Sequence, residues 1–186
     1  MTSPTLPTVE GVHLRLRAVQ PDDAAYLHRL RTDPRHATHL SPVTGTVADQ
    51  RAWIEGYQRR EAAGQEAYFI IERRDGVPCG TVRLYDIADD RFTWGSWILD
   101  AAKPPKAALE SAVLSFGVGF DHPHRTHALI DVRHGNTRAI AFYRRFGMAE
   151  TGADDLNIYF TYARSRFLAD RPAHMAVLRA AAERSE

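Results

Sequence analysis

Cysteine is nearly absent from this chain, and so are other features that mark specialised classes of protein. The 186 residues include one cysteine, Cys79, which excludes an internal disulfide framework and a metal site built from several cysteines. There is no run of 18 apolar residues and no signal-peptide pattern, so we expect a soluble, cytoplasmic protein with no membrane partner. The formal net charge is +1, which gives no reason to expect nucleic acid as a partner.

The composition is typical of one globular domain. Apolar residues make up 44% of the chain and charged residues 25%, both close to the averages for folded proteins. A length of 186 residues suits one domain with a full core and is short for two. The sequence shows no internal repeat and no low-complexity linker. We therefore expect a single domain.

Hydrophobic periodicity predicts an alternation of strands and helices. The expected strands are 13–19, 66–74, 77–87, 91–99, 127–133 and 156–163, and the expected helices are 20–33, 46–61, 106–120, 136–146 and 172–186. This order predicts an α/β fold of mixed α+β type, with a central mixed sheet of about six or seven strands flanked by helices and followed by a C-terminal helix. We place a flexible tail at 1–12, the domain at 13–165 and a C-terminal helical extension at 166–186.

Three stretches carry a resemblance to a known family. They are LRLRAVQPDDAAYLHRL (14–30), FTWGSWIL (92–99) with the helix after it, and HGNTRAIAFYRRFGM (134–148). Together they resemble the GNAT acyltransferase superfamily, in particular the branch of the Rim-type and amino-sugar N-acetyltransferases. The resemblance implies an enzyme that moves an acyl group to an amine, with acetyl-CoA or another acyl-CoA as co-substrate and no metal.

The segment AKPPKAAL (102–109) lies where the family binds the pyrophosphate of coenzyme A. The family pattern there is Arg/Gln-x-x-Gly-x-Gly/Ala, which puts Lys103 at the first position, Lys106 at the first glycine and Ala108 at the second small residue. Pro104 and Pro105 have no N–H to donate, so the backbone cradle is degenerate. The two lysine ammonium groups would replace the missing donors by direct charge.

The resemblance also implies other contacts to the donor. Asn136 matches the family asparagine that contacts the pantetheine arm, and it is also a good helix N-cap. In the family, the strand that corresponds to 91–99 splays from its neighbour and offers backbone groups to the pantetheine. The expected cofactor-binding residues are Trp97, Ile98, Leu99, Lys103, Lys106, Ala107, Ala108 and Asn136.

Tyr143 lies at the position that resembles the family's general acid, a phenol that protonates the sulfur of the departing coenzyme A. The general base stays open, with Asp86, His127, Asp131 and His134 as candidates. Alternation along a strand puts His127 and Asp131 on the same side.

The loop 35–45 and the helix 46–61 cover the acceptor side in this family. The expected substrate-binding residues are His39, Ser41, Trp53, Tyr57, Tyr85 and Trp94. Their aromatic rings suit an acceptor that carries a sugar ring or a nucleotide. The leading hypothesis is therefore an N-acyltransferase acting on a small-molecule amine, possibly an amino sugar. Protein N-terminal acetylation, a non-catalytic binding module and a carrier-protein-dependent acyltransferase stay open as alternatives, as does a homodimer.

Overall fold

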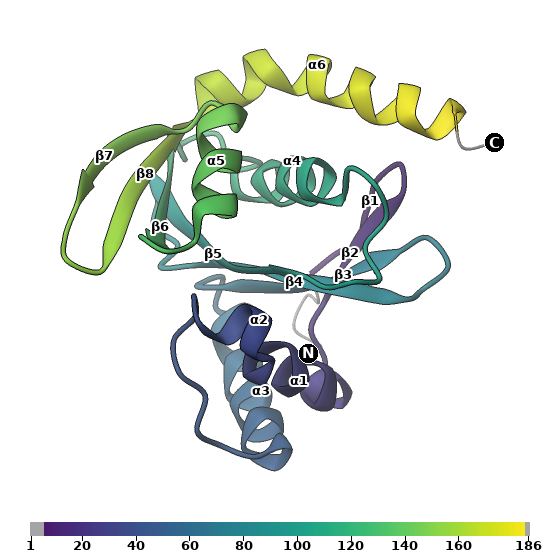
Figure 1. The fold of residues 1–186 in the computed structure, drawn as a ribbon, viewed down its shortest axis with the longest axis vertical. Helices are drawn as coiled ribbons and strands as arrows, with labels where there is room; N and C mark the ends of the chain where they lie inside the picture. The colour runs from purple at the N-terminus through teal and green to yellow at the C-terminus, as the bar shows by residue number, and fades with distance from the viewer. Residues whose placement is uncertain (1–5, 185–186) are drawn as a thin grey trace.

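Strands and helices follow one another in mixed order in the computed structural model, which describes residues 6–184 (Figure 1). The strands are β1 (Val9–Glu10), β2 (Leu14–Ala18), β3 (Ala67–Arg73), β4 (Pro78–Tyr85), β5 (Arg91–Leu99), β6 (His127–Arg133), β7 (Ala149–Ala153) and β8 (Asn157–Ala163). The helices are η1 (Pro21–Asp23), α1 (Ala24–Thr32), α2 (Pro34–Ala37), α3 (Val47–Ala62), α4 (Ala107–Gly119), α5 (Thr137–Phe146) and α6 (Arg164–Glu183).

The strands form one sheet in the order β1-β2-β3-β4-β5-β6-β8-β7. Neighbours are antiparallel except for β5 and β6, which pair in parallel over only three residues each, Arg91–Thr93 with His127–Leu129. A parallel pair needs a crossover connection, and α4 supplies it. Beyond these three pairs the two strands separate, which opens the sheet between Trp94–Leu99 and Ile130–Arg133.

The sheet has eight strands, slightly more than the six or seven that periodicity predicted. The additional strands are short and lie at the two edges of the sheet. β1 has only two residues, and all five residues of β7 are exposed. Neither has the apolar alternation by which a half-buried strand is recognised in a sequence.

Helices cover the two faces of the sheet unequally. α4, α5 and α6 lie on one face, and α1, α2 and α3 lie on the other face (Figure 1). The larger core lies under α4–α6 and includes Trp94, Phe116 and Tyr143. A smaller core around Tyr57 joins α1 and α3 to β3. β6 alternates buried and exposed residues, so its side that faces away from α4 and α5 is open to solvent.

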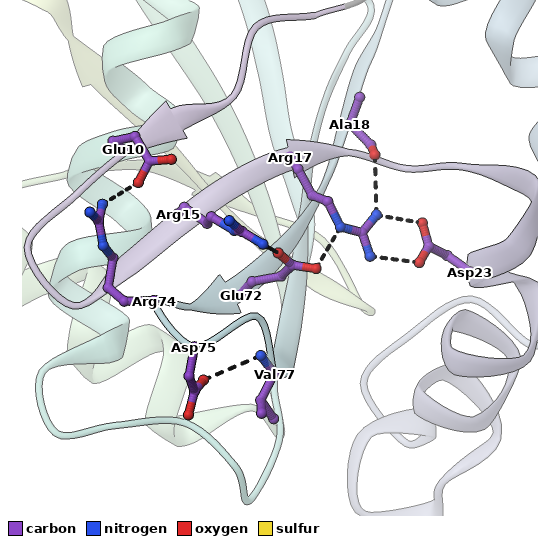
Figure 2. A network of polar contacts seen from close by, with 9 residues as sticks. All are labelled: Glu10, Arg15, Arg17, Ala18, Asp23, Glu72, Arg74, Asp75 and Val77. Atoms are coloured by element: carbon purple, nitrogen blue, oxygen red, sulfur yellow. Dashed lines mark hydrogen bonds and ion pairs between the residues drawn. The ribbon is translucent and has the colours of Figure 1, made fainter.

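A buried carboxylate fixes β2 against β3 and η1 (Figure 2). Glu72 is 3% exposed and accepts bonds from Arg15 and Arg17 on the neighbouring strand. Arg17 also pairs with Asp23 at 2.7 Å. Its bond to Asp23 raises the pKa of the Arg17 guanidinium above its ordinary value. These ion pairs therefore hold β2, β3 and η1 together.

Some helix ends follow local signals in the sequence, but the start of α6 does not. Thr46 and Asp49 form a capping box at the start of α3, and Gly147 ends α5 with φ 96°. The C-terminal helix was predicted to start at Pro172, but α6 starts at Arg164 and contains this proline in its interior. Proline has no N–H, so the helical hydrogen bond to the carbonyl of Leu168, four residues earlier, is not made. The Leu168 side chain is 47% exposed, so water has access to this turn of the helix.

The predicted tail at 1–12 lies partly outside the described residues. Leu6 and Val9 pack against the larger core, and Val9–Glu10 pair with β2. In the predicted C-terminal extension, 166–186, the last two residues also lie outside the described part of the chain.

Candidate functional site

A cleft of about 570 Å³ opens where β5 ends and α5 begins. Its walls come from the end of β5 and the turn after it, from the first turns of α5, and from the segment 35–40. It therefore lies on the side of the molecule where β5 and β6 have separated. Seven of the residues predicted from the sequence line it: His39, Trp97, Ile98, Leu99, Lys103, Ala108 and Asn136.

The cleft is electropositive. Arg35, Lys103, Arg138 and Arg145 line it, whereas among the described residues Asp100 supplies its only carboxylate. Asp100 is already engaged, because it accepts bonds from the Ala102 N–H and the Tyr26 hydroxyl. Arg35 is partly neutralised by Asp33 at 2.6 Å. The remaining cations favour an anionic ligand such as a phosphate.

The start of α4 offers fewer backbone donors than a glycine-rich loop. Lys106 caps the helix with φ 65°, the left-handed region that glycine adopts without strain. The Ala107 N–H donates to the Pro104 carbonyl at 3.3 Å. Within residues 6–184 no backbone carbonyl accepts from the Ala108 or Leu109 N–H, and Ala108 lines the cleft. The amide of Ala108 is thus the donor available to a ligand here.

The two lysines of the KPPK segment (103–106) have different surroundings. Lys103 lines the cleft, and its ammonium donates to the Asp100 carbonyl at 3.4 Å. Lys106 is exposed and lies outside the lining, and Ala107 is buried at 2% exposure. The structure therefore brings Lys103 to the cleft but not Lys106 or the side chain of Ala107.

The open edge of β5 presents backbone groups to the cleft. The Asp100 N–H donates to the Cys79 carbonyl on β4, so the backbone groups of Asp100 point toward β4 and away from the gap between β5 and β6. Successive residues of a strand direct their backbone groups to opposite edges. The N–H and C=O of Leu99 consequently face the gap, whereas those of Ile98 face β4. Asn136 also lines the cleft while its side chain caps α5, accepting from the Ala139 N–H at 3.3 Å.

Tyr143 is buried beside this cleft, one helical position after the lining residue Phe142. Its ring packs edge-on against Trp94 and Phe160 at centroid distances of 5.9 and 5.5 Å. Within the described residues its hydroxyl has no hydrogen-bond partner. Burial raises the pKa of this phenol well above its ordinary value, and the charge of Asp131 adds to the effect. Tyr143 is therefore a neutral phenol with a proton to give.

The aromatic residues predicted to bind the acceptor, Trp53, Tyr57, Tyr85 and Trp94, do not line this cleft. Trp94 and Tyr57 have no exposed surface, and the Trp94 indole donates to the Ser115 hydroxyl. The guanidinium of Arg83 lies 5.1 Å from the Trp53 ring and 4.8 Å from the Tyr85 ring, so it occupies one face of each ring.

Of the predicted residues in the loop 35–45, His39 reaches the cleft, where its ring lies near Gly135. Ser41 is exposed and does not line the cleft. The role of the six acceptor residues stays a prediction.

Several lining residues were not predicted from the sequence. They are Arg35, His36, Leu40, Asp100, Ala101, Gly135, Thr137, Arg138, Ala139, Phe142 and Arg145. A signal for part of this set was available, because Arg138, Phe142 and Arg145 have the spacing i, i+4, i+7 that puts them on one face of a helix. The residues from the segment 35–40 carried no such signal, since their position depends on the tertiary fold.

The described part of the chain offers neither a metal site nor a membrane-spanning helix. Within 6–184 no group of three or more histidine, cysteine, aspartate or glutamate side chains is placed to hold a metal ion. In the same part of the chain, no helix has the length and apolar character needed to span a membrane.

Comparisons with known proteins agree with this arrangement. Residues 13–149 match the family model described as the acetyltransferase (GNAT) domain. Among solved structures, apo FdhC, described as a nucleotide-linked sugar GNAT, is 34% identical with a TM-score of 0.83, over 92% of this chain and 97% of that one. RimJ from Mycobacterium smegmatis in complex with CoA-disulfide is 18% identical with a TM-score of 0.70, over 90% and 94% of the two chains.

A third similar structure is spermidine N-acetyltransferase from Vibrio cholerae in complex with CoA and spermine. It is 16% identical with a TM-score of 0.71, over 85% of this chain and 99% of that chain. At this level of identity, the last two similarities concern the fold alone. No curated protein sequence matches the chain.

Proposed function

Because the chain belongs to the GNAT acetyltransferase family, we propose that it transfers an acyl group from acyl-CoA to the amine of a nucleotide-linked amino sugar. The binding of acyl-CoA, the acyl donor, is inferred from the electropositive cleft at the point where β5 and β6 separate. The acceptor part rests on the 34% identity to a nucleotide-linked sugar GNAT over nearly the whole of both chains.

In this proposal the donor lies along the open edge of β5. The amide groups of its pantetheine arm bond to the backbone of Leu99, with the Asn136 side chain on the opposite wall. Its phosphates meet the Ala108 N–H and the ammonium of Lys103, and the cations of α5 line the other side. Tyr143 supplies the proton that the leaving thiolate needs.

The test of this function is a panel of acceptor amines offered with acetyl-CoA, followed by thiol release. The panel contains free amino sugars, nucleotide-linked amino sugars, polyamines and peptides with free N-termini. We expect a nucleotide-linked amino sugar to be acylated with the highest kcat/KM. Reaction of peptides alone would replace the proposal with protein N-terminal acetylation. Binding of CoA without thiol release from any amine would favour a non-catalytic binding module.

Lys103→Ala is expected to weaken CoA binding about tenfold and to flatten its salt dependence. One charge-assisted contact to a phosphate is lost, and such contacts on an exposed site are screened within about 8 Å at physiological salt. Calorimetry at low and high salt measures both effects.

Two controls make the Lys103 result specific. Phosphopantetheine lacks the adenosine pyrophosphate and should bind equally to the variant and the parent. Lys106→Gly removes the neighbouring charge outside the cleft, so it should change CoA affinity less than about twofold while relieving the left-handed backbone strain. Equal losses for CoA and phosphopantetheine in Lys103→Ala would contradict a phosphate contact.

A further inference from the structure

The parallel ladder between β5 and β6 ends at a well-defined row of residues. Its last pair is Thr93 with Leu129. Had the ladder continued, the next residues on the same face of the sheet would have been Gly95 and Asp131. Both lie on the face away from α4 and α5, because their neighbours Trp94 and Ile130 are buried in the core under those helices. Gly95 and Asp131 therefore border the opening between the strands.

Asp131 is an exposed carboxylate with no partner in the described part of the chain. This distinguishes it from two other acidic residues, Glu66 and Asp154, which are both paired. Glu66 is paired with Arg60 and Arg83, at 2.9 and 2.7 Å. Asp154 accepts the hydroxyl of Tyr159 at 2.5 Å. The charge of Asp131 is thus available to a ligand.

Two tyrosines flank Asp131 on this open face. A Cβ placed on Gly95 would lie 3.1 Å from the Tyr85 hydroxyl, so Tyr85 leans over the glycine toward the opening. Tyr159 is the partner of Asp131 in the β6–β8 ladder and is 38% exposed. Glycine at position 95 leaves space where any other residue would have a side chain.

The electrostatics agree that these groups lie near one another. Burial raises the pKa of Tyr85 to about 12, and the charge of Asp131 is the next cause. Burial also raises the pKa of Tyr143, again with Asp131 as the second cause, although Tyr143 lies on the opposite face. The negative charge of Asp131 therefore acts on Tyr143, the phenol that the proposed function uses as its acid.

We propose that Asp131 binds the ammonium group of the acceptor at the opening between β5 and β6 and accepts its proton. This inference rests on the proposed function and extends it to the residue that activates the amine. The other candidates for the base are placed differently. Asp86 lies in the turn after β4, beyond the last β4–β5 pair, Tyr85 with Thr93. His127 pairs with Arg91 at the closed end of the ladder, and His134 is bonded to the Asp154 carbonyl.

The proton balance is complete without a further reagent. Asp131 takes one proton from the ammonium, passes it to water, and leaves a neutral amine. The nitrogen lone pair forms the N–C bond to the thioester carbonyl carbon, and the C–S bond then breaks. The sulfur leaves with the electron pair of that bond and takes the proton of Tyr143. The second proton of the nitrogen, released as the amide forms, restores the Tyr143 phenol through solvent.

Asp131→Asn is expected to lower kcat/KM for the amine about 30-fold at pH 7. This is somewhat less than the typical effect of a general base, because water at this exposed position can accept the proton in part. The loss should shrink as the pH rises toward the pKa of the acceptor amine, since a larger fraction of the amine is then already neutral. CoA affinity by calorimetry and the unfolding midpoint should stay at the parental values.

Other titratable and charged groups around the opening also contribute to the pH profile of kcat/KM. They are Arg83, Tyr85 and Asp86 from β4 and its following turn, Tyr143 from α5, Tyr159 from β8, and His127 and Arg133 on β6 itself. All of these groups are unchanged in the variant, so their contributions cancel in the ratio of variant to parent. Asp155→Asn, which removes an exposed carboxylate in the turn between β7 and β8, is the matched control and should keep parental kinetics at every pH.

Two outcomes would overturn the inference. One is a variant with parental kcat/KM and an unchanged pH profile. The other is a loss of the same size at every pH, which would mean that Asp131 orders the site without taking the proton. A parent enzyme that binds CoA but releases no thiol with any amine of the panel would instead overturn the proposed function. This result is distinguished from the others because it appears before any variant is made.

Discussion

Tyr143→Phe is expected to lower turnover about 100-fold while leaving acyl-CoA affinity nearly unchanged. The size is that of a typical general acid, and the substitution removes only the hydroxyl. The ring keeps its packing against Trp94 and Phe160, so the fold has no reason to change. Because burial raises the pKa of this phenol above its ordinary value, it stays protonated up to pH 10. Steady-state and single-turnover kinetics measure the effect.

Phe142→Leu is the matched control, since the neighbouring ring lines the cleft but carries no proton. It should change the affinity for the donor more than turnover. Parental turnover in Tyr143→Phe, with chemistry shown to be the slow step, would remove Tyr143 from the mechanism. A large loss of donor affinity in the same variant would assign Tyr143 to binding instead.

Glu110→Ala is expected to destabilise the protein by about 3–5 kcal/mol, the largest effect on stability that we predict. Glu110 is 1% exposed and lies in the first turn of α4. One of its oxygens accepts the N–H groups of His13 and Leu14, at 2.8 and 3.0 Å, and the other contacts the His13 ring at 3.1 Å. The substitution leaves two backbone donors without a partner and opens a cavity beside β2.

Glu110→Gln separates the role of the hydrogen bonds from that of the charge. Its amide oxygen can still accept both N–H groups, so this variant should lose only about 1–2 kcal/mol. Denaturation with urea gives the free energy of unfolding for both variants. Equal and small losses would show that water replaces the carboxylate, and that Glu110 does not connect α4 to β2 as the structure indicates.

The part of the fold that follows from local patterns could be predicted from the sequence. β5 and β6 have the expected bounds, 91–99 and 127–133, because each is a short run rich in strand-forming apolar residues. The end of α5 at Gly147 was likewise expected from its left-handed C-cap. The start of α6 was not, because a proline such as Pro172 normally marks a helix boundary and here lies in the interior.

The residues of the candidate site were also predictable only in part. Lys103 and Asn136 were predicted from the resemblance to a family, and both line the cleft, because their positions are set by the ends of β5 and β6. The surroundings of Trp53 and Tyr85 could not be predicted, since nothing local in the sequence shows that Arg83 lies over both rings. Whether an aromatic ring is available to a ligand depends on residues that are brought beside it only by folding.

The three-residue ladder between β5 and β6 has a consequence for cooperativity. Strands β1–β5 are joined by antiparallel ladders, and β6–β8 form a second such group. So few backbone bonds join the groups that a local opening at Thr93 and Leu129 breaks little of either one. Amide protons in this three-residue ladder should therefore exchange with solvent through sub-global openings, and faster than amide protons at the centre of either group of strands. A bound donor that touches Leu99 and Asn136, as proposed, would connect the two groups and slow that exchange, which would couple ligand binding to the cohesion of the sheet.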